Sequence, residues 1–198
     1  MPIPWYQVEI FQAAGKKEIV MLEEMLSEEM IITPLKSTKK RSVIEEMASR
    51  FLETGIVEDR DKLIKALLDR EAIESTAIGG GVAIPHARSD AIDGLAMVLG
   101  RSQEGVDFDS VDKKPVKLIF MIVSSPGICR EYLQVLARIA RLCSNEKMRE
   151  ELNKAKNSRE IMGIIRGFDA GSGRFENIRL HKGRSVYTNE KKDNKDKG

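Results

Sequence analysis

One histidine in the chain lies in a setting that suits it to carry a phosphoryl group. His86 ends the short apolar run of residues 82–85, which directly follows three consecutive glycines. A neutral imidazole can attack phosphorus with one ring nitrogen while a hydrogen bond holds the other. Pro85 restricts the backbone next to this nucleophile. The second histidine, His181, lies in a polar segment near the C-terminus, so His86 is the candidate phosphoryl acceptor.

Residues of three kinds near His86 in the sequence could bind the negative charge of a phosphoryl group. Glycine N–H groups can converge on an anion because no side chain obstructs them. A threonine hydroxyl can add a hydrogen bond, and guanidinium groups match the geometry of phosphate oxygens. The candidate phosphate site consists of Arg70, Thr76, Gly79, Gly80, Gly81 and Arg88.

Each of these residues also has an ordinary structural interpretation. A histidine at the end of a strand is often only hydrogen-bonded, and three glycines often form only a turn. These glycines match neither the dinucleotide-binding pattern nor the phosphate loop that continues into Lys-Ser or Lys-Thr. Arg70 at a helix C-terminus would interact favourably with the helix dipole without any catalytic role. Thr76 could cap a turn, and Arg88 could simply be exposed.

The composition excludes several other classes of protein. The chain has 198 residues, 41% of them hydrophobic and 32% charged, which suits one domain with extensions. Its formal net charge of +2 gives no reason to expect a nucleic-acid partner. Cys129 and Cys143 form neither a disulfide framework nor a zinc spacing, so we expect free thiols in a reducing cytoplasm, no metal and no cofactor.

Neither a signal peptide nor a membrane span is predicted. The N-terminal residues lack the basic start and the continuous apolar stretch of a signal sequence. The most apolar run, Val116 to Val123, is far shorter than the ~20 residues needed to cross a bilayer. We therefore expect a soluble cytoplasmic protein without direct membrane insertion.

Apolar periodicity predicts helices that alternate with short strands. Strands are expected at residues 31–32, 82–84, 95–99 and 116–123, the last apolar on both faces. Helices are expected near residues 22–26, from Ser37 or Thr38 to Gly55, and from Asp59 to Glu71. Three more are expected over residues 130–142, 147–155 and 158–165, the last ended by Gly167. This order predicts an α/β fold, a three-layer α/β/α domain with a mixed central sheet flanked by helices.

The composition also divides the chain into three parts. Residues 1–20 show no clear period and are interpreted as an N-terminal extension, and residues 21–169 form the predicted domain. Residues 170–198 begin with a Gly/Ser joint and end in a charge run, which predicts a flexible, mostly disordered tail. Basic residues in this tail lack an aromatic platform apart from Tyr187, so nucleic-acid binding is not expected.

The residues around His86 resemble a known family. An Arg70-Glu71 pair ends a helix, Ser75-Thr76-Ala77-Ile78-Gly79 follows, and Ala83-Ile84-Pro85-His86 completes the pattern. This combination is similar to the type-2 IIA components of the bacterial phosphotransferase system (PTS), which include the fructose, mannitol and nitrogen-regulatory proteins. The resemblance covers roughly Met25 to Phe168.

The resemblance implies roles for the candidate residues and for partners. It implies that His86 accepts phosphate from an HPr-like carrier protein and passes it to the cysteine of a IIB protein, or uses it as a regulatory signal. Arg70 would stabilise charge, Thr76 and the glycines would line the site, and Glu71 would be structural or orienting. A homodimer is left open. The alternative is a nitrogen-type regulatory module that controls a transporter, a kinase or a transcription regulator, with weak or no phosphotransfer.

The chain departs from the family pattern at one position of the predicted site. Many members place a second histidine at the start of the long helix, where this chain has Tyr132. A tyrosine hydroxyl can still donate a hydrogen bond to phosphate, but it is not an imidazole and stays neutral at ordinary pH. Tyr132 therefore either contacts the phosphoryl group or only packs its ring, and both interpretations remain open.

Overall fold

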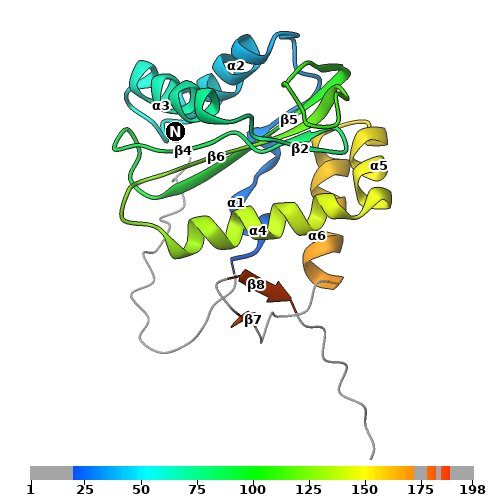
Figure 1. Cartoon of the computed structure of the whole chain (residues 1–198). Coiled ribbons are helices and arrows are strands. Elements are labelled where there is room, and N and C mark those ends of the chain that lie inside the picture. The colour runs from blue at the N-terminus through cyan, green and yellow to red at the C-terminus, as the bar shows by residue number, and fades with distance from the viewer. Residues whose placement is uncertain (1–19, 172–177, 182–183, 188–198) are drawn as a thin grey trace, which may run out of the picture.

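The structure is a computed structural model that describes residues 20–171, 178–181 and 184–187 (Figure 1). The N-terminal extension predicted for residues 1–20 lies almost entirely outside the described residues, as does most of the tail predicted from residue 170 onward. Within that tail the structure describes a two-stranded antiparallel hairpin of β7 (Ile178–His181) and β8 (Arg184–Tyr187), which the sequence analysis did not predict.

A mixed six-stranded sheet forms the centre of the domain. β5 and β6 run antiparallel, whereas β1 pairs parallel with β5, and both β3 and β4 pair parallel with β6. The strands are β1 (Ile31–Ile32), β2 (Ala77–Gly79), β3 (Val82–Ala83), β4 (His86–Arg88), β5 (Leu95–Val106) and β6 (Val116–Ser124). Their order across the sheet is β1-β5-β6-β3-β2, with β4 beside β6.

Helices cover both faces of the sheet, which confirms the predicted three-layer architecture (Figure 1). α2 (Lys40–Glu53) and α3 (Arg60–Ile73) lie on one face. The other face carries α1 (Leu22–Met25), α4 (Arg130–Ser144), α5 (Glu146–Lys154) and α6 (Ser158–Gly171). A short 3₁₀ turn, Glu28–Met30, precedes β1. In the described part of the chain, no helix is both long and apolar enough to cross a membrane.

The central strand β6 is buried because helices cover it on both sides. Every residue from Leu118 to Val123 is fully buried, as its uninterrupted apolar sequence predicts. On the α2 side, the predicted stripe that includes Val43, Met47 and Phe51 is also fully buried. β4 and the His86 region thus lie on a rigid support rather than on a free loop.

Local sequence signals set some element ends and missed others. Asp59 caps α3 as predicted, because its carboxylate accepts a hydrogen bond from the Lys62 N–H at 3.0 Å. The predicted Ser37 or Thr38 cap of α2 is wrong. Lys39 occupies that position without a side-chain cap. The Glu46 carboxylate instead accepts the backbone N–H of Ser37 at 2.7 Å.

Two further boundaries differ because tertiary contacts extend the elements. α6 continues past Gly167 to Gly171, since the Asp169 carboxylate in its last turn is buried against Arg138 of α4 at 2.7 Å. β5 continues to Val106 along β6, beyond the predicted end at Leu99. The predicted glycine loop also contains the short strand β2, which pairs with β3 as a hairpin.

Candidate functional site

His86 is held at the start of β4, beside the buried strand β6. It pairs with Ile122 in register, and the carbonyl of the preceding Pro85 accepts the Ile122 N–H at 2.9 Å. The neighbours on both sides, Pro85 and Ala87, are buried, while the imidazole itself is half-buried. The ring therefore has a fixed backbone and a side that reaches solvent, as a residue that exchanges a group with another protein requires.

Hydrogen bonds to the two ring nitrogens assign the tautomer of His86. Nδ1 lies 2.7 Å from the backbone carbonyl of Ile84, and a carbonyl can only accept, so Nδ1 carries the proton. Nε2 lies 3.2 Å from Nε of Arg70, which can only donate, so Nε2 presents its lone pair. The neutral ring is thus oriented with Nε2 as its nucleophilic atom.

The surroundings of His86 also favour its neutral form. Burial lowers the pKa of the imidazole, and the positive charge of Arg70 lowers it further. The hydrogen bond to the Ile84 carbonyl and the charge of Glu71 act in the opposite direction, but the pKa remains below its usual value. A neutral ring at physiological pH is the form that can attack phosphorus.

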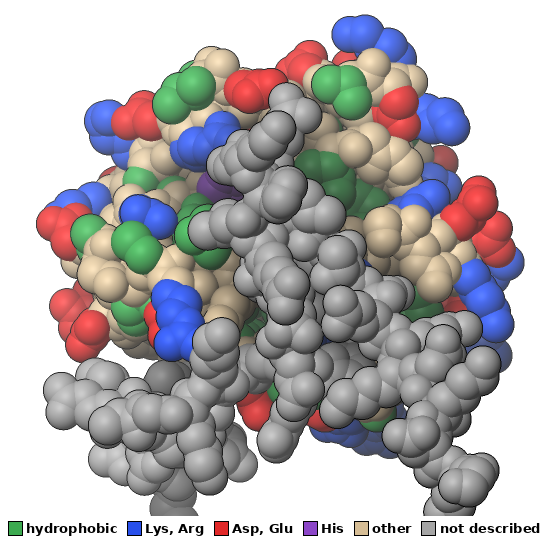
Figure 2. Space-filling view, turned by 60° about the horizontal axis from the view of Figure 1, so that its bottom comes forward, with side chains coloured by type: hydrophobic (Ala, Val, Ile, Leu, Met, Phe, Trp, Pro, Cys, Tyr) green, Lys and Arg blue, Asp and Glu red, His purple; other side chains and the backbone are tan. Residues whose placement is uncertain are grey.

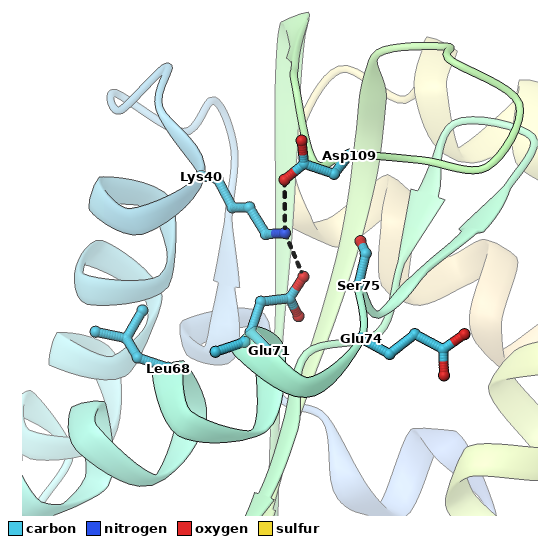
Figure 3. Close-up of a pocket in the computed structure, with 7 residues that line it drawn as sticks. Lys40, Leu68, Glu71, Glu74, Ser75 and Asp109 are labelled. Carbon is cyan, nitrogen blue, oxygen red and sulfur yellow. Dashed lines mark hydrogen bonds and ion pairs between the residues drawn. The ribbon is translucent and has the colours of Figure 1, made fainter.

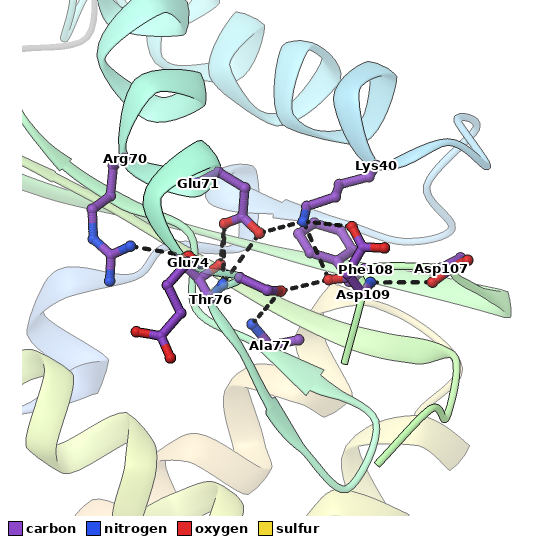
Figure 4. Close-up of polar contacts among 10 residues, drawn as sticks. Lys40, Arg70, Glu71, Glu74, Thr76, Ala77, Asp107, Phe108 and Asp109 are labelled. Carbon is purple, nitrogen blue, oxygen red and sulfur yellow. Dashed lines mark hydrogen bonds and ion pairs between the residues drawn. The ribbon is translucent and has the colours of Figure 1, made fainter. Parts of the chain in front are cut away.

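Arg70 occupies the last turn of α3, where the sequence places it. Its Nη1 donates to the Glu74 carbonyl at 3.1 Å (Figure 4), and its Nε is directed at His86. The first bond anchors the side chain, so the guanidinium is preorganised beside Nε2. A fixed cation at this place can stabilise charge that develops on a transferring phosphoryl group.

Tyr132 and Arg88 complete the set of groups around the imidazole. The Tyr132 ring lies 6.1 Å from the His86 ring, edge to face, and the Arg88 guanidinium stacks over the Tyr132 ring at 5.0 Å. Burial raises the pKa of the Tyr132 phenol, although Arg88 and Arg70 lower it in part, so the phenol stays protonated and able to donate. Packing and hydrogen bonding are therefore compatible for this residue.

The Thr76 side chain points toward Glu71 and not toward the imidazole of His86. Its hydroxyl donates to Glu71 Oε2 at 2.6 Å, and its N–H donates to Oε1 at 3.1 Å (Figure 4). Thr76 and Glu71 are both buried. The Thr76 hydroxyl proton is thus already engaged, and its link to His86 is indirect, through Ile84.

The three glycines are not brought to His86. Gly79 ends β2, Gly80 and Gly81 form the turn to β3, and all three have positive φ, which explains why glycine occupies these positions. β3 pairs with β6 at Leu118, four residues before the partner of His86, or roughly 13 Å along the strand. The turn lies beyond β3. Its central N–H, that of Gly80, donates to the Asp112 carboxylate at 2.8 Å.

One residue of the site region was missed by the sequence analysis. Nζ of Lys40, from α2, lies 2.6 Å from Oε1 of the buried Glu71 and 3.1 Å from Oδ2 of Asp109 (Figures 3 and 4). It also donates to the Phe108 carbonyl at 3.2 Å. No sequence motif contains Lys40, so only the packing of α2 beside α3 could identify it.

A groove of about 420 Å³ opens beside this ion pair (Figure 3). It is lined by Lys40, Leu68, Glu71, Ala72, Glu74, Ser75 and Asp109, and not by His86. Among the described residues, no group of three or more His, Cys, Asp or Glu side chains is arranged to hold a metal ion. The described contacts place Arg70 at Nε2 of the imidazole and Arg88 over the neighbouring Tyr132 ring.

Apolar side chains are exposed on the elements that frame His86. Figure 2 shows a histidine at the surface with hydrophobic and basic side chains around it. Leu133, next to Tyr132 on α4, is 57% exposed, and Ile73, at the end of α3, is 81% exposed. These two residues lie on the helices that carry Arg70 and Tyr132.

Comparison with known proteins agrees with this geometry. Residues 24–167, well over half of the chain, match the family described as phosphoenolpyruvate-dependent sugar phosphotransferase system, EIIA 2. The fructose-specific EIIA component of Haloferax volcanii is 36% identical over 126 residues, which cover 64% of this chain and 82% of that protein.

Two further relatives show the range of the likeness. The fructose-specific EIIABC component of Bacillus subtilis is 36% identical over 148 residues, 75% of this chain but only 23% of that longer protein. The crystal structure of nitrogen regulatory protein IIA-Ntr from Neisseria meningitidis superposes with a TM-score of 0.69 at 30% identity, covering 73% of this chain and 98% of that one. With an α/β/α fold and an oriented histidine at the predicted position, the chain belongs to the EIIA type-2 family of the phosphotransferase system.

Proposed function

We propose that the chain is a phosphohistidine carrier that accepts a phosphoryl group on Nε2 of His86. The observation that carries this proposal is the pair of opposite hydrogen bonds on the ring, in which Nδ1–H donates to Ile84 and Nε2 accepts from Arg70. Together they leave Nε2 as the unprotonated, nucleophilic nitrogen beside a cation, and the Arg70 N–H moves from the Nε2 lone pair to the phosphoryl oxygens as the group arrives. Family membership supports the same chemistry.

The transfer is a displacement at phosphorus between two histidines. The Nε2 lone pair of His86 forms the new N–P bond, while the N–P bond of the donor phosphohistidine breaks and its electron pair returns to the donor ring. The phosphorylated His86 ring keeps its Nδ1 proton and carries a positive charge, which the Ile84 carbonyl stabilises. In the second transfer the acceptor nucleophile forms a bond to phosphorus, and the Nε2–P electrons return to His86.

The donor is proposed to be an HPr-like phosphocarrier in the cytoplasm. The receiver is proposed to be a IIB protein, to which the phosphoryl group passes on a cysteine thiolate. The exposed Ile73 and Leu133 provide apolar surface for both partners on α3 and α4, the helices that carry Arg70 and Tyr132. We infer a phosphotransferase role because the match to the fructose-specific EIIA component of Haloferax volcanii spans 82% of that protein.

A regulatory role is the second candidate, and it rests on a different relative. The Neisseria meningitidis protein with the TM-score of 0.69 is named a nitrogen regulatory protein, and 98% of its chain is matched. In this role the phosphorylation state of His86 would change binding to a transporter, a kinase or a transcription regulator. The same site serves both roles, since both need a phosphorylated His86.

Phosphorylation by purified components tests the proposal. The chain is incubated with Enzyme I, an HPr-like carrier and radiolabelled phosphoenolpyruvate, and the product is treated with acid and with base. We expect label that is labile in acid and stable in base, present in the His181→Ala variant and absent from His86→Ala. Label that persists in His86→Ala would remove His86 from this role.

A binding experiment separates transport from regulation. Phosphorylated and unphosphorylated chain are immobilised and exposed to a cell extract. A IIB protein that becomes phosphorylated supports the carrier role, whereas a regulator or transporter whose recovery depends on the state of His86 supports the regulatory role. Equal recovery in both states contradicts a phosphorylation-dependent signal.

A further inference from the structure

Arg70 donates to Nε2 of His86, and on the Nδ1 side the tautomer depends on one backbone carbonyl, whose position is itself held from two sides. The Ile84 carbonyl accepts from Nδ1 of His86 at 2.7 Å. The Ile84 N–H donates to the Thr76 carbonyl at 3.0 Å, and the next residue, Pro85, is tied to β6 through its own carbonyl. Thr76 is therefore the partner that fixes Ile84 on the side opposite β6.

Glu71 in turn fixes Thr76. One buried carboxylate accepts both the backbone N–H of Thr76, at 3.1 Å, and its hydroxyl proton, at 2.6 Å (Figure 4). Only 5% of the Glu71 side chain is exposed. A buried carboxylate that accepts several hydrogen bonds is rigid, because any displacement leaves donors or the charge unsatisfied.

Lys40 offsets the free-energy cost of burying the Glu71 carboxylate. A buried unpaired carboxylate is costly and would tend to take up a proton. The Lys40 ammonium, 2.6 Å from Glu71, neutralises it from a different helix, and Asp109 and the Phe108 carbonyl hold the ammonium in place (Figure 4). Burial alone would lower the pKa of Lys40, but its bonds to Glu71 and Asp109 outweigh that effect and raise it, so Lys40 stays charged.

From this chain of contacts we propose that Lys40, Glu71 and Thr76 are positioning residues. They hold the Ile84 carbonyl against Nδ1 of His86 and thereby select the tautomer that presents Nε2 to the phosphoryl donor. None of the three needs to touch the phosphoryl group. The proposal rests on the proposed function of His86, but the tautomer can be measured without any transfer.

The experiment uses the full chain with His181→Gln, so that His86 is the one histidine observed. The ring nitrogens are labelled with ¹⁵N, and NMR chemical shifts report which nitrogen carries the proton. The background protein should show Nδ1–H and an unprotonated Nε2. Thr76→Val removes the hydroxyl donor at nearly constant shape and should give a mixture of tautomers, whereas Thr76→Ser should restore the background spectrum.

The same variants are compared in phosphotransfer. Thr76→Val and Lys40→Met should lower kcat by roughly tenfold or more with a smaller change in KM, since they misorient the nucleophile without removing partner surface. Lys40→Arg keeps the charge and should recover most of the rate. Lys62→Met is the matched control, because it breaks a 2.7 Å ion pair with Asp90 on the protein surface and should change neither reading.

The outcomes separate this inference from the proposed function. A single background tautomer in both Thr76→Val and Lys40→Met overturns the positioning role, whatever the rates. A mixed tautomer with unchanged kcat overturns it as well. If Lys40→Met fails to fold, the Thr76→Val and Thr76→Ser pair decides alone. Failure of the background protein to take up radiolabelled phosphate on His86 would instead contradict the proposed function, and the tautomer result would remain valid.

Discussion

Replacement of Arg70 by glutamine removes a cation that contacts Nε2 of His86. The guanidinium donates to Nε2 at 3.2 Å and is anchored by the Glu74 carbonyl at 3.1 Å. Glutamine keeps a polar side chain of moderate length but has no charge. The substitution therefore tests electrostatic stabilisation separately from packing.

The expected magnitude follows from the geometry. The ground-state bond to Nε2 is long for a charged donor, so most of the contribution of Arg70 should arise when charge develops on the phosphoryl oxygens. Loss of one preorganised donor to developing negative charge costs about 2.7–4 kcal/mol, or ~10²- to 10³-fold in rate. Unfolding free energy should fall by less than ~1 kcal/mol, because Arg70 is only partly buried and lies at a helix end.

The pH dependence provides a second reading with a definite sign. Burial is the largest cause of the lowered His86 pKa, and Arg70 adds to it. Removing Arg70 therefore raises the pKa, so the ring becomes protonated and loses its nucleophilic lone pair at a higher pH than in the unmodified chain. The acid limb of the rate profile should move toward higher pH in Arg70→Gln.

The assay is rapid-quench transfer from a phosphorylated HPr-like carrier, with kcat/KM measured from about pH 5.5 to pH 8, the range over which imidazoles titrate. Arg159→Gln is the matched control, since Arg159 is an exposed arginine of α6 that pairs with Glu28 at 3.7 Å, outside the His86 site. It should leave the acid limb in place. A loss of less than about threefold in Arg70→Gln, or an acid limb that does not move, would refute the electrostatic role assigned to Arg70.

Three other predictions concern the stability of the fold and the reactivity of its cysteines. Asp169→Ala should lower the free energy of unfolding by about 3–5 kcal/mol in urea titrations, because the carboxylate buried against Arg138 also accepts the Glu23 N–H at 2.8 Å; a loss under ~1 kcal/mol would contradict this. Hydrogen bonds from Ser110, Gly80 and Lys114 lower the pKa of Asp112 to about 2. This stabilisation is present above the unfolded-state pKa of 3.8 and is lost as pH falls through about 2. Asp112→Asn should therefore be less stable than the parent chain at pH 7, and the difference should shrink as pH falls through this window. A difference in urea midpoint that is independent of pH would count against this assignment. Iodoacetamide at about pH 8 should label the exposed Cys129 in the native chain and reach Cys143 only after denaturation, since burial raises the pKa of the Cys143 thiol to about 12; equal labelling, read by mass spectrometry, would argue otherwise.

Features that depend on neighbours in the sequence were predictable. Asp59 was expected as a helix cap and Gly55 as a helix end, because capping and positive φ are decided within one turn of chain. The buried strand at residues 116–123 was expected because a strand that is apolar on both faces is stable only when both faces are covered. Arg70 was a candidate cation for the His86 site from its residue type, the family resemblance favoured the same pairing, and the structure brings the two side chains to 3.2 Å.

Features that depend on register and packing were not predictable. Thr76 and the glycines are close to His86 in the sequence, yet the hairpin of β2 and β3 turns the glycines away along β6, and Glu71 takes the Thr76 hydroxyl. The interpretation of Tyr132 was open until the packing of α4 placed its ring beside the imidazole. Lys40 lies in no motif at all, and only the contact of α2 with α3 brings it to Glu71.

The amino-acid sequence alone indicated the candidate nucleophile, the helix that carries its arginine and the layered α/β/α architecture, because periodicity, capping and a composite motif are local properties. The tertiary structure decided which nitrogen of His86 is unprotonated, which groups surround the ring and which candidate site residues lie elsewhere. Those properties depend on hydrogen bonds between elements far apart in the chain, and such bonds form only once the strands have found their register on β6 and the helices have packed over them.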